Sequence, residues 1–74
     1  MGSEITIYSR DACIYCDMAI RLAVSKKMNL TVLKLDKDYS IEEFTAKFMY
    51  AKTVPQIILN GEHIGGYQDL KDLV

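Results

Sequence analysis

The spacing of the two cysteines is the sequence feature that most limits how this chain can fold. Cys13 and Cys16 are the only cysteines among its 74 residues. A disulfide between them would close a loop too short to stabilise the folded state much, because that effect grows with loop length. So short a chain must therefore rely on a small apolar core of regular elements. The cysteine pair then needs a chemical explanation rather than a structural one.

Composition and charge exclude several classes of protein. Half of the residues are apolar and 26% are charged, which is typical of a globular domain and not of a disordered chain. The net charge of −1 lacks the basic footprint of a nucleic-acid-binding or membrane-surface protein. No apolar run approaches the ~18 residues that cross a membrane, and the N-terminus does not resemble a secretory signal. We expect one domain over residues 1–74 that binds neither nucleic acid nor membrane.

Residues 4–35 show the pattern of a strand, a helix and a second strand. Residues 4–8 alternate in polarity as a strand does, and residues 30–35 form another apolar segment. Between them, residues 13 to about 28 repeat apolar side chains at the spacing of a helix. The apolar face of this helix is expected to contain Tyr15, Met18, Ala19 and Leu22. This order predicts a right-handed crossover between two parallel strands.

A second helix is predicted downstream by its start signal. Ser40 and Glu43 match a capping box, so the helix is expected to begin at Ile41 and to end near Tyr50. Its inward face is expected to contain Ile41, Phe44 and Phe48.

The last part of the chain predicts a hairpin followed by a helix. Asn60-Gly61 separates two short apolar segments, residues 56–59 and 62–64, and suits the positive φ angles of a tight hairpin turn. Residues 67–74 have room for a short helix. Its inward residues are expected to be Leu70 and Leu73 or Val74. The order β-α-β-α-β-β-α predicts an α/β fold, with helices on both faces of a four-stranded mixed sheet.

Cys13 lies where a loop leads into the first helix, a position that favours a thiolate. Free N–H groups and the helix dipole stabilise negative charge there, and Arg10 adds a positive charge nearby. Such surroundings lower the pKa of a thiol below its ordinary value. Cys13 is therefore the expected nucleophile. Cys16 follows one helical turn later, where it can form a disulfide with Cys13.

A zinc site and a pair of core cysteines are weaker interpretations of this spacing. Half a zinc site would need two more ligands, and the chain offers only His63 and scattered carboxylates. His63 is expected on the surface of a hairpin strand. Two unrelated core cysteines would not need this spacing at the start of a helix. The pattern favours a redox pair.

Two further segments are candidates to line a binding site. Thr53-Val54-Pro55 contains the only proline and precedes a strand, where proline is tolerated. A cis bond before Pro55 would instead open the Val54 backbone to an extended substrate. Gly65-Gly66-Tyr67 either lets the backbone approach a ligand or is a flexible break between strand and helix.

Taken together, these segments resemble the glutaredoxin family. The resemblance rests on Cys-Ile-Tyr-Cys at 13–16, Thr-Val-Pro-Gln at 53–56 and Asn-Gly-Glu-His-Ile-Gly-Gly-Tyr at 60–67, in the family's order and spacing. The resemblance covers residues 5–74. Within the family, the chain is most similar to the small dithiol glutaredoxins of bacteria and bacteriophages. It implies a thioredoxin fold and a glutathione-disulfide oxidoreductase that uses glutathione as co-substrate. We expect a monomer in the bacterial cytoplasm, or in the host cytoplasm for a phage protein.

The resemblance also implies a role for each matched residue. Cys13 would be the nucleophile, Cys16 the resolving cysteine, and Pro55 would follow a cis bond. The residues expected to bind glutathione are Arg10, Tyr15, Lys52, Thr53, Val54, Pro55, Gly66, Tyr67 and Gln68. The basic pair would face the glycine carboxylate, and residues 66–68 would face the γ-glutamyl end.

Three further roles stay open beside this interpretation. Ribonucleotide reductase is a candidate acceptor of the electrons. A reductant served by thioredoxin reductase is disfavoured because the chain has no tryptophan. A [2Fe–2S] carrier would use Cys13 and glutathione as ligands in a dimer, and no other metal is expected.

The chain differs from many glutaredoxins at two of the matched positions. They have proline at the position of Ile14, and they have an acidic residue at the position of Gln68, which neighbouring Asp69 could replace.

Overall fold

The computed structural model describes residues 2–49, 51 and 53–74. Its elements follow the expected order and are β1 (Glu4–Ser9), α1 (Ile14–Ser25), β2 (Asn29–Lys34), α2 (Ile41–Lys47), β3 (Gln56–Leu59), β4 (Glu62–Gly65) and α3 (Tyr67–Leu73). Two helices end earlier than expected. α1 stops at Ser25 because the chain turns at Lys27, which has a positive φ of 57°. α2 stops at Lys47, and Tyr50 lies outside the described residues.

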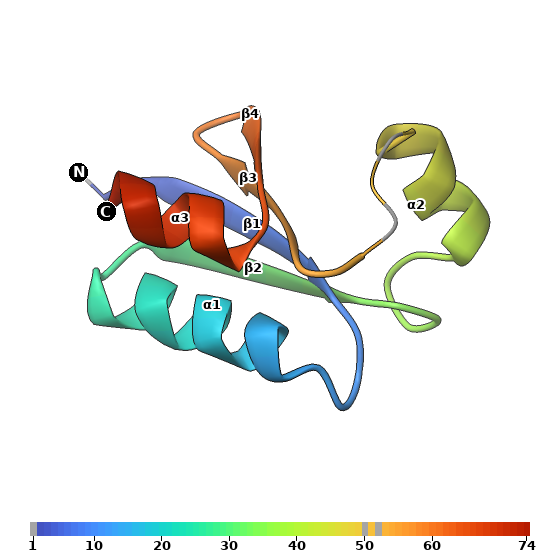
Figure 1. Cartoon of the computed structure of the whole chain (residues 1–74), viewed down its shortest axis with the longest axis horizontal. Coiled ribbons are helices and arrows are strands. Elements are labelled where there is room, and N and C mark those ends of the chain that lie inside the picture. Colours follow the sequence, from blue (N-terminus) through green and yellow to red (C-terminus); the bar gives the residue numbers. More distant parts are fainter. Residues whose placement is uncertain (1, 50, 52) are drawn as a thin grey trace.

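In the described part of the chain, four strands form one mixed sheet in the order β2-β1-β3-β4 (Figure 1). β1 pairs with β2 in parallel and with β3 antiparallel, and β3 pairs antiparallel with β4. The β3–β4 turn is formed by Asn60 and Gly61, both with positive φ, as such a turn requires. The mixed sheet expected from the sequence is therefore confirmed.

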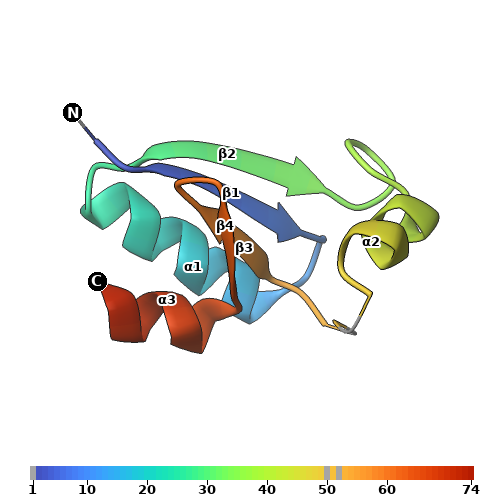
Figure 2. The same cartoon turned by 90° about the horizontal axis from the view of Figure 1, so that it is seen from above.

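Apolar clusters cover both faces of the sheet. Side chains alternate along β1, so that Ile5 and Ile7 face one cluster and Tyr8 faces the other. The first cluster is built from Ile5, Ile7, Ala19, Ala23, Ile57 and Leu70, and the second from Tyr39, Phe44 and Phe48. α1 and α3 lie side by side over the first cluster, whereas α2 lies beyond the carboxyl ends of β1 and β2 (Figures 1 and 2). α1 and α3 therefore cover one face, and Phe44 and Phe48 from the α2 segment contribute to the cluster on the other face.

The buried face of α1 differs from the expected one. Tyr15 and Met18 are 58% and 37% exposed, although Ala19 is buried and Leu22 is half-buried. The buried residues of α1 are Cys16, Ala19 and Ala23. Small side chains let the helix lie close to the sheet and to α3. The expected apolar face is therefore confirmed at Ala19 and Leu22 and wrong at Tyr15 and Met18.

The predicted buried faces of α2 and α3 are also partly wrong. In α2, Phe44 and Phe48 are buried as expected, but Ile41 is 54% exposed. In α3, Leu70 is buried as expected, but Leu73 and Val74 are 62% and 40% exposed.

No helix within residues 2–49, 51 and 53–74 is both long and apolar enough to span a membrane.

Tyr39 links the second apolar cluster to β1, a central strand of the sheet, through a ring contact and a hydrogen bond. Its ring is buried and meets the ring of Tyr8 edge-on, with 5.1 Å between centroids. Its hydroxyl donates a hydrogen bond to the carbonyl oxygen of Ser9 at 2.6 Å. Burial raises the pKa of Tyr39 above its ordinary value of 10.0. The neutral phenol is therefore the form that the folded state prefers.

Replacing Tyr39 by Phe should lower the free energy of unfolding at pH 7 by about 1 kcal/mol. The loss is modest because the Ser9 carbonyl also accepts from the backbone N–H of Leu35 at 3.0 Å. The pKa of Tyr39 is raised in the folded state, so the neutral phenol contributes its full stabilisation below pH ~10. This stabilisation is lost as the pH rises through the folded-state pKa. Urea unfolding of both proteins at pH 7 and above pH ~10 tests this. A difference that grew at high pH would contradict it.

Candidate active site

The two cysteines lie at the start of α1 and differ in exposure. Cys13 is the N-cap of the helix, and its Sγ accepts a hydrogen bond from the backbone N–H of Cys16 at 3.2 Å. The two residues form a disulfide, with 5.2 Å between their Cα atoms. Cys16 is only 1% exposed, whereas Cys13 is half-buried. An incoming group therefore reaches the Cys13 sulfur first.

The segment before β3 lies against this disulfide. The peptide bond between Val54 and Pro55 is cis, as the family resemblance implies. The carbonyl oxygen of Val54 lies 3.8 Å from Cys13 Sγ. The contact arises because β1 and β3 are antiparallel neighbours, so the chain leaving β1 and the chain entering β3 meet at one end of the sheet.

A shallow groove of about 470 Å³ begins at Val54 and runs past the rings of Tyr15 and Tyr67. The two ring centroids are 6.2 Å apart. The groove is lined by Tyr15, Thr53, Val54, Pro55, Gly66, Tyr67, Gln68 and Asp69. We call it the tyrosine groove. Of the predicted glutathione-binding residues that the structure describes, the groove brings together all except Arg10.

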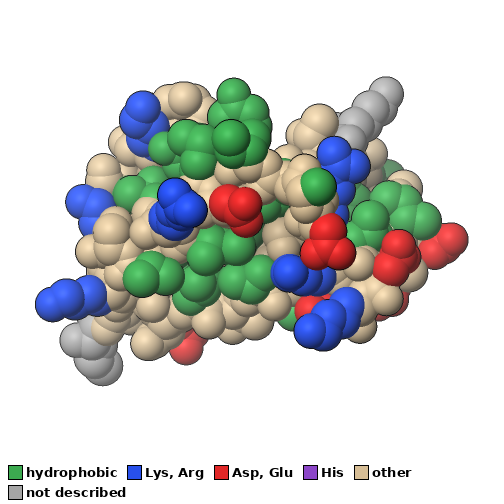
Figure 3. Space-filling view, turned by 90° about the horizontal axis from the view of Figure 1, so that it is seen from below, with side chains coloured by type: hydrophobic (Ala, Val, Ile, Leu, Met, Phe, Trp, Pro, Cys, Tyr) green, Lys and Arg blue, Asp and Glu red, His purple; other side chains and the backbone are tan. Residues whose placement is uncertain are grey.

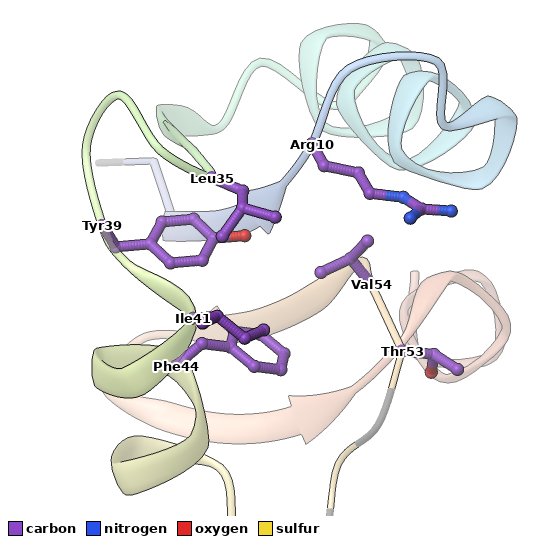
Figure 4. Close-up of a pocket in the computed structure, with 7 residues that line it drawn as sticks. All are labelled: Arg10, Leu35, Tyr39, Ile41, Phe44, Thr53 and Val54. Atoms are coloured by element: carbon purple, nitrogen blue, oxygen red, sulfur yellow. The ribbon is translucent and has the colours of Figure 1, made fainter.

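Arg10 lies in a neighbouring pocket of about 240 Å³, which we call the Arg10 pocket. Its lining residues are Arg10, Leu35, Tyr39, Ile41, Phe44, Thr53 and Val54 (Figure 4). Thr53 and Val54 line both cavities, so the tyrosine groove and the Arg10 pocket adjoin along this segment. Lys52, the other predicted cation, lies outside the described residues.

The tyrosine groove also contains a carboxylate. Asp69 Oδ2 accepts a hydrogen bond from the backbone N–H of Gly66 at 2.9 Å. Gln68 turns along α3 and donates to Asp72 Oδ1 at 3.1 Å. Gly65 has a φ of +116°, and a Cβ added there would collide with the Asp69 carboxylate. Gly65 is therefore required by the backbone and is not merely a flexible break.

A buried glutamine supports the Thr53–Pro55 segment, although the sequence alone gave it no role. Gln56 is 7% exposed, and its Nε2 donates to the carbonyl oxygen of Thr53 at 2.8 Å. Its Oε1 lies 2.7 Å from Nε2 of His63, whose ring packs on Phe48 with centroids 4.6 Å apart. His63 is exposed, as expected, and it also orients this amide. A polar residue directly after the proline, at the start of an apolar strand, was the available signal.

Within the described ranges, no three His, Cys, Asp or Glu side chains are grouped so that they could hold a metal ion.

Replacing Gln56 by Leu should loosen the segment that lies against Cys13. The substitution keeps the volume but removes the hydrogen bond to Thr53, a loss of about 1 kcal/mol. We expect the NMR backbone order parameter of Val54 to fall from near ~0.85 towards ~0.6. His63→Ala is the matched control and should have a smaller effect, because it leaves the bond to Thr53 intact. An unchanged order parameter in the Gln56 variant would show that this side chain does not order the segment.

The chain has relatives of known family. Residues 5–64 match the family model described as Glutaredoxin. The chain is 35% identical over 68 residues to Glutaredoxin 3 of Escherichia coli (strain K12), and the match covers 92% of this chain and 82% of that protein. It is 32% identical over 72 residues to Glutaredoxin-C4 of Arabidopsis thaliana, covering 93% of this chain and 53% of the plant protein.

Solved structures that resemble this chain are also glutaredoxins. Glutaredoxin 1 from Francisella tularensis, crystallised with cacodylate, has a TM-score of 0.82 at 27% identity, covering 96% of this chain and 91% of that one. A dithiolic glutaredoxin of Trypanosoma brucei brucei has a TM-score of 0.83 at 32% identity, covering 96% and 76%. The thioredoxin-like fold and the cysteine pair at a helix start define a thiol–disulfide oxidoreductase. Within that class, the chain belongs to the glutaredoxin family.

Proposed function

We propose that the thiol–disulfide exchange of this protein is coupled to glutathione, which binds along Val54 between Arg10 and Asp69. The observation that carries the proposal is the pair of adjoining cavities at Val54, with a cation in one and a carboxylate in the other. The reactive sulfur of Cys13 is 3.8 Å from the Val54 carbonyl oxygen, where the two cavities meet.

The charges of glutathione match this asymmetry. Its glycine end carries a carboxylate alone, whereas its γ-glutamyl end carries a carboxylate and an ammonium group. The guanidinium of Arg10 suits the glycine carboxylate. Asp69 suits the ammonium group at the other end, where the family often has an acidic residue at the position of Gln68. The cysteine of glutathione then lies at Val54, beside Cys13.

The proposed cycle is a series of exchanges without net change in the number of disulfides. The Cys13 thiolate attacks a substrate disulfide, which releases one substrate thiol and forms a mixed disulfide. Cys16 attacks that bond, releases the second thiol and leaves the Cys13–Cys16 disulfide. One glutathione then attacks Cys13 and frees Cys16, and a second removes the first as glutathione disulfide. The Cys16 N–H and the α1 N-terminus stabilise the Cys13 thiolate that begins the cycle and that its last step regenerates.

One structurally similar protein has been solved with this ligand. A buckwheat glutaredoxin, with a TM-score of 0.80 at 22% identity, was crystallised as a glutathione complex. At this identity the likeness concerns the fold alone. Glutathione-poised cytosol remains the predicted location, and ribonucleotide reductase remains a predicted acceptor. No contact among the described residues selects that enzyme over other protein disulfides.

The two cysteine variants should separate the roles of the sulfurs. Cys13→Ser should abolish turnover of a glutathionylated small-molecule substrate, because no other exposed thiol can begin the exchange. Cys16→Ser should retain this turnover but lose the reduction of protein disulfides, which need a resolving thiol. The measurement is NADPH consumption coupled through glutathione reductase. Equal loss of activity in both variants on the small substrate would contradict these roles.

Replacing Arg10 by Gln should raise the apparent KM for glutathione more than it lowers kcat. The guanidinium would bind a carboxylate remote from the reacting sulfur, so its loss weakens ground-state and transition-state binding alike. We expect a rise of roughly tenfold in KM, the low end for one hydrogen bond to a charged group. Arg21→Gln is the control, because Arg21 is exposed on α1 and lines neither cavity. A KM unchanged by the Arg10 substitution would remove this contact.

A further inference from the structure

The Arg10 pocket has an apolar end that the proposed glutathione contacts leave empty. Arg10 lies at one end, and the side chains of Leu35, Tyr39, Ile41 and Phe44 gather at the other, with Val54 between them (Figure 4). Ile41 is 54% exposed, although Phe44, the other large apolar residue of α2, is buried. The exposed part of Ile41 belongs to the wall of this pocket.

Glutathione cannot fill this apolar end. With its glycine carboxylate at Arg10, the molecule stops there, and glycine has no side chain. A protein substrate continues beyond its cysteine by about 3.3 Å for each residue in extended form, and every residue other than glycine adds a side chain. In a peptide that runs along Val54 in the same direction, the residue after the cysteine takes the place of this glycine. Its side chain starts beside Val54, which also lines the apolar end, and is therefore within reach of that end.

We propose that the Arg10 pocket selects protein disulfides in which the attacked cysteine is followed by an apolar side chain. The inference rests on the proposed function, because that function sets the direction of the bound chain. The occupant is an extended segment of the substrate protein, with its apolar side chain against Ile41 and Phe44. Arg10 favours an acidic group in the same segment. The ion pair found among the described residues joins Lys34 to Asp11 and leaves the Arg10 guanidinium for such a group.

The continuity of the two cavities supports this choice of occupant. Thr53 and Val54 line both, so a chain held by the Val54 backbone passes from one cavity to the other without leaving the surface. Other apolar side chains are exposed elsewhere, including several on the face viewed from below, where basic side chains lie among them (Figure 3). Exposure alone therefore does not make a subsite, and an exposed apolar residue outside both cavities can serve as a control.

The test is an exchange equilibrium on Cys16→Ser protein, which holds a mixed disulfide on Cys13 without resolving it. Protein carrying glutathione on Cys13 is mixed with a reduced tetrapeptide. The peptide thiolate attacks Cys13 Sγ, the peptide–Cys13 bond forms, and glutathione leaves as its thiol, so no oxidant is needed. Acid quenching and mass spectrometry give the ratio of the two mixed disulfides. The peptides are Ala-Cys-Leu-Asp, Ala-Cys-Gly-Asp and Leu-Cys-Gly-Asp, each with both ends blocked.

Leucine after the cysteine should raise the exchange constant about fivefold over glycine, as expected for partial burial of one leucine side chain. Leucine before the cysteine should change it less than about twofold. Ile41→Ala should abolish most of the preference. Val24→Ala, which shortens an equally exposed apolar residue on α1, should preserve it. Circular dichroism checks that both variants fold.

Three results would overturn the inference. They are equal constants for leucine and glycine after the cysteine, a preference for leucine before it, and a preference that survives Ile41→Ala. Failure of the proposed function has a different signature, which is the absence of glutathione-coupled turnover by the unaltered protein. The exchange constants can still be measured in that case, because glutathione serves only as the reference thiol.

Discussion

The antiparallel pairing of β1 with β3 is the interaction on which the site depends. Ile7 and Ile57 face each other at the centre of the sheet, and both are fully buried. This register puts the chain that leaves β1 and the chain that enters β3 at the same end of the sheet. The result is the contact between Cys13 and Val54, two residues separated by 41 positions in the sequence. The Cys13 sulfur and the backbone of Val54 therefore belong to one site.

Local signals in the sequence predicted much of this architecture. The capping box is present, with Ser40 and Glu43 bonded reciprocally at 3.1 Å. Asn60 and Gly61 form the expected hairpin turn, and Cys13 is the N-cap residue of α1. Each of these features is decided by neighbouring residues, through capping bonds or backbone angles, and so can be read from a short segment.

Features that depend on tertiary contacts could not be predicted in the same way. The inward face of α1 consists of small residues such as Ala19 and Ala23, because the helix packs closely against the sheet and α3. Gln56 donates to the carbonyl oxygen of Thr53, and the pairing of β3 with β4 brings His63 to the other end of the same amide. Ile41 repeats the helical spacing of its buried neighbours, yet it lies at the mouth of a pocket. Periodicity identifies an apolar face but does not show what covers it.

In the proposed function, the charge asymmetry about Val54 orients glutathione and also sets the direction of any longer substrate. The most direct test is NMR on Cys16→Ser protein carrying glutathione on Cys13, with nuclear Overhauser contacts measured from the two ends of the bound molecule. We predict contacts from the glycine methylene to Arg10 and from the γ-glutamyl chain to Tyr67. Contacts in the reverse order, or a bound glutathione with no contacts beyond its own cysteine, would contradict it.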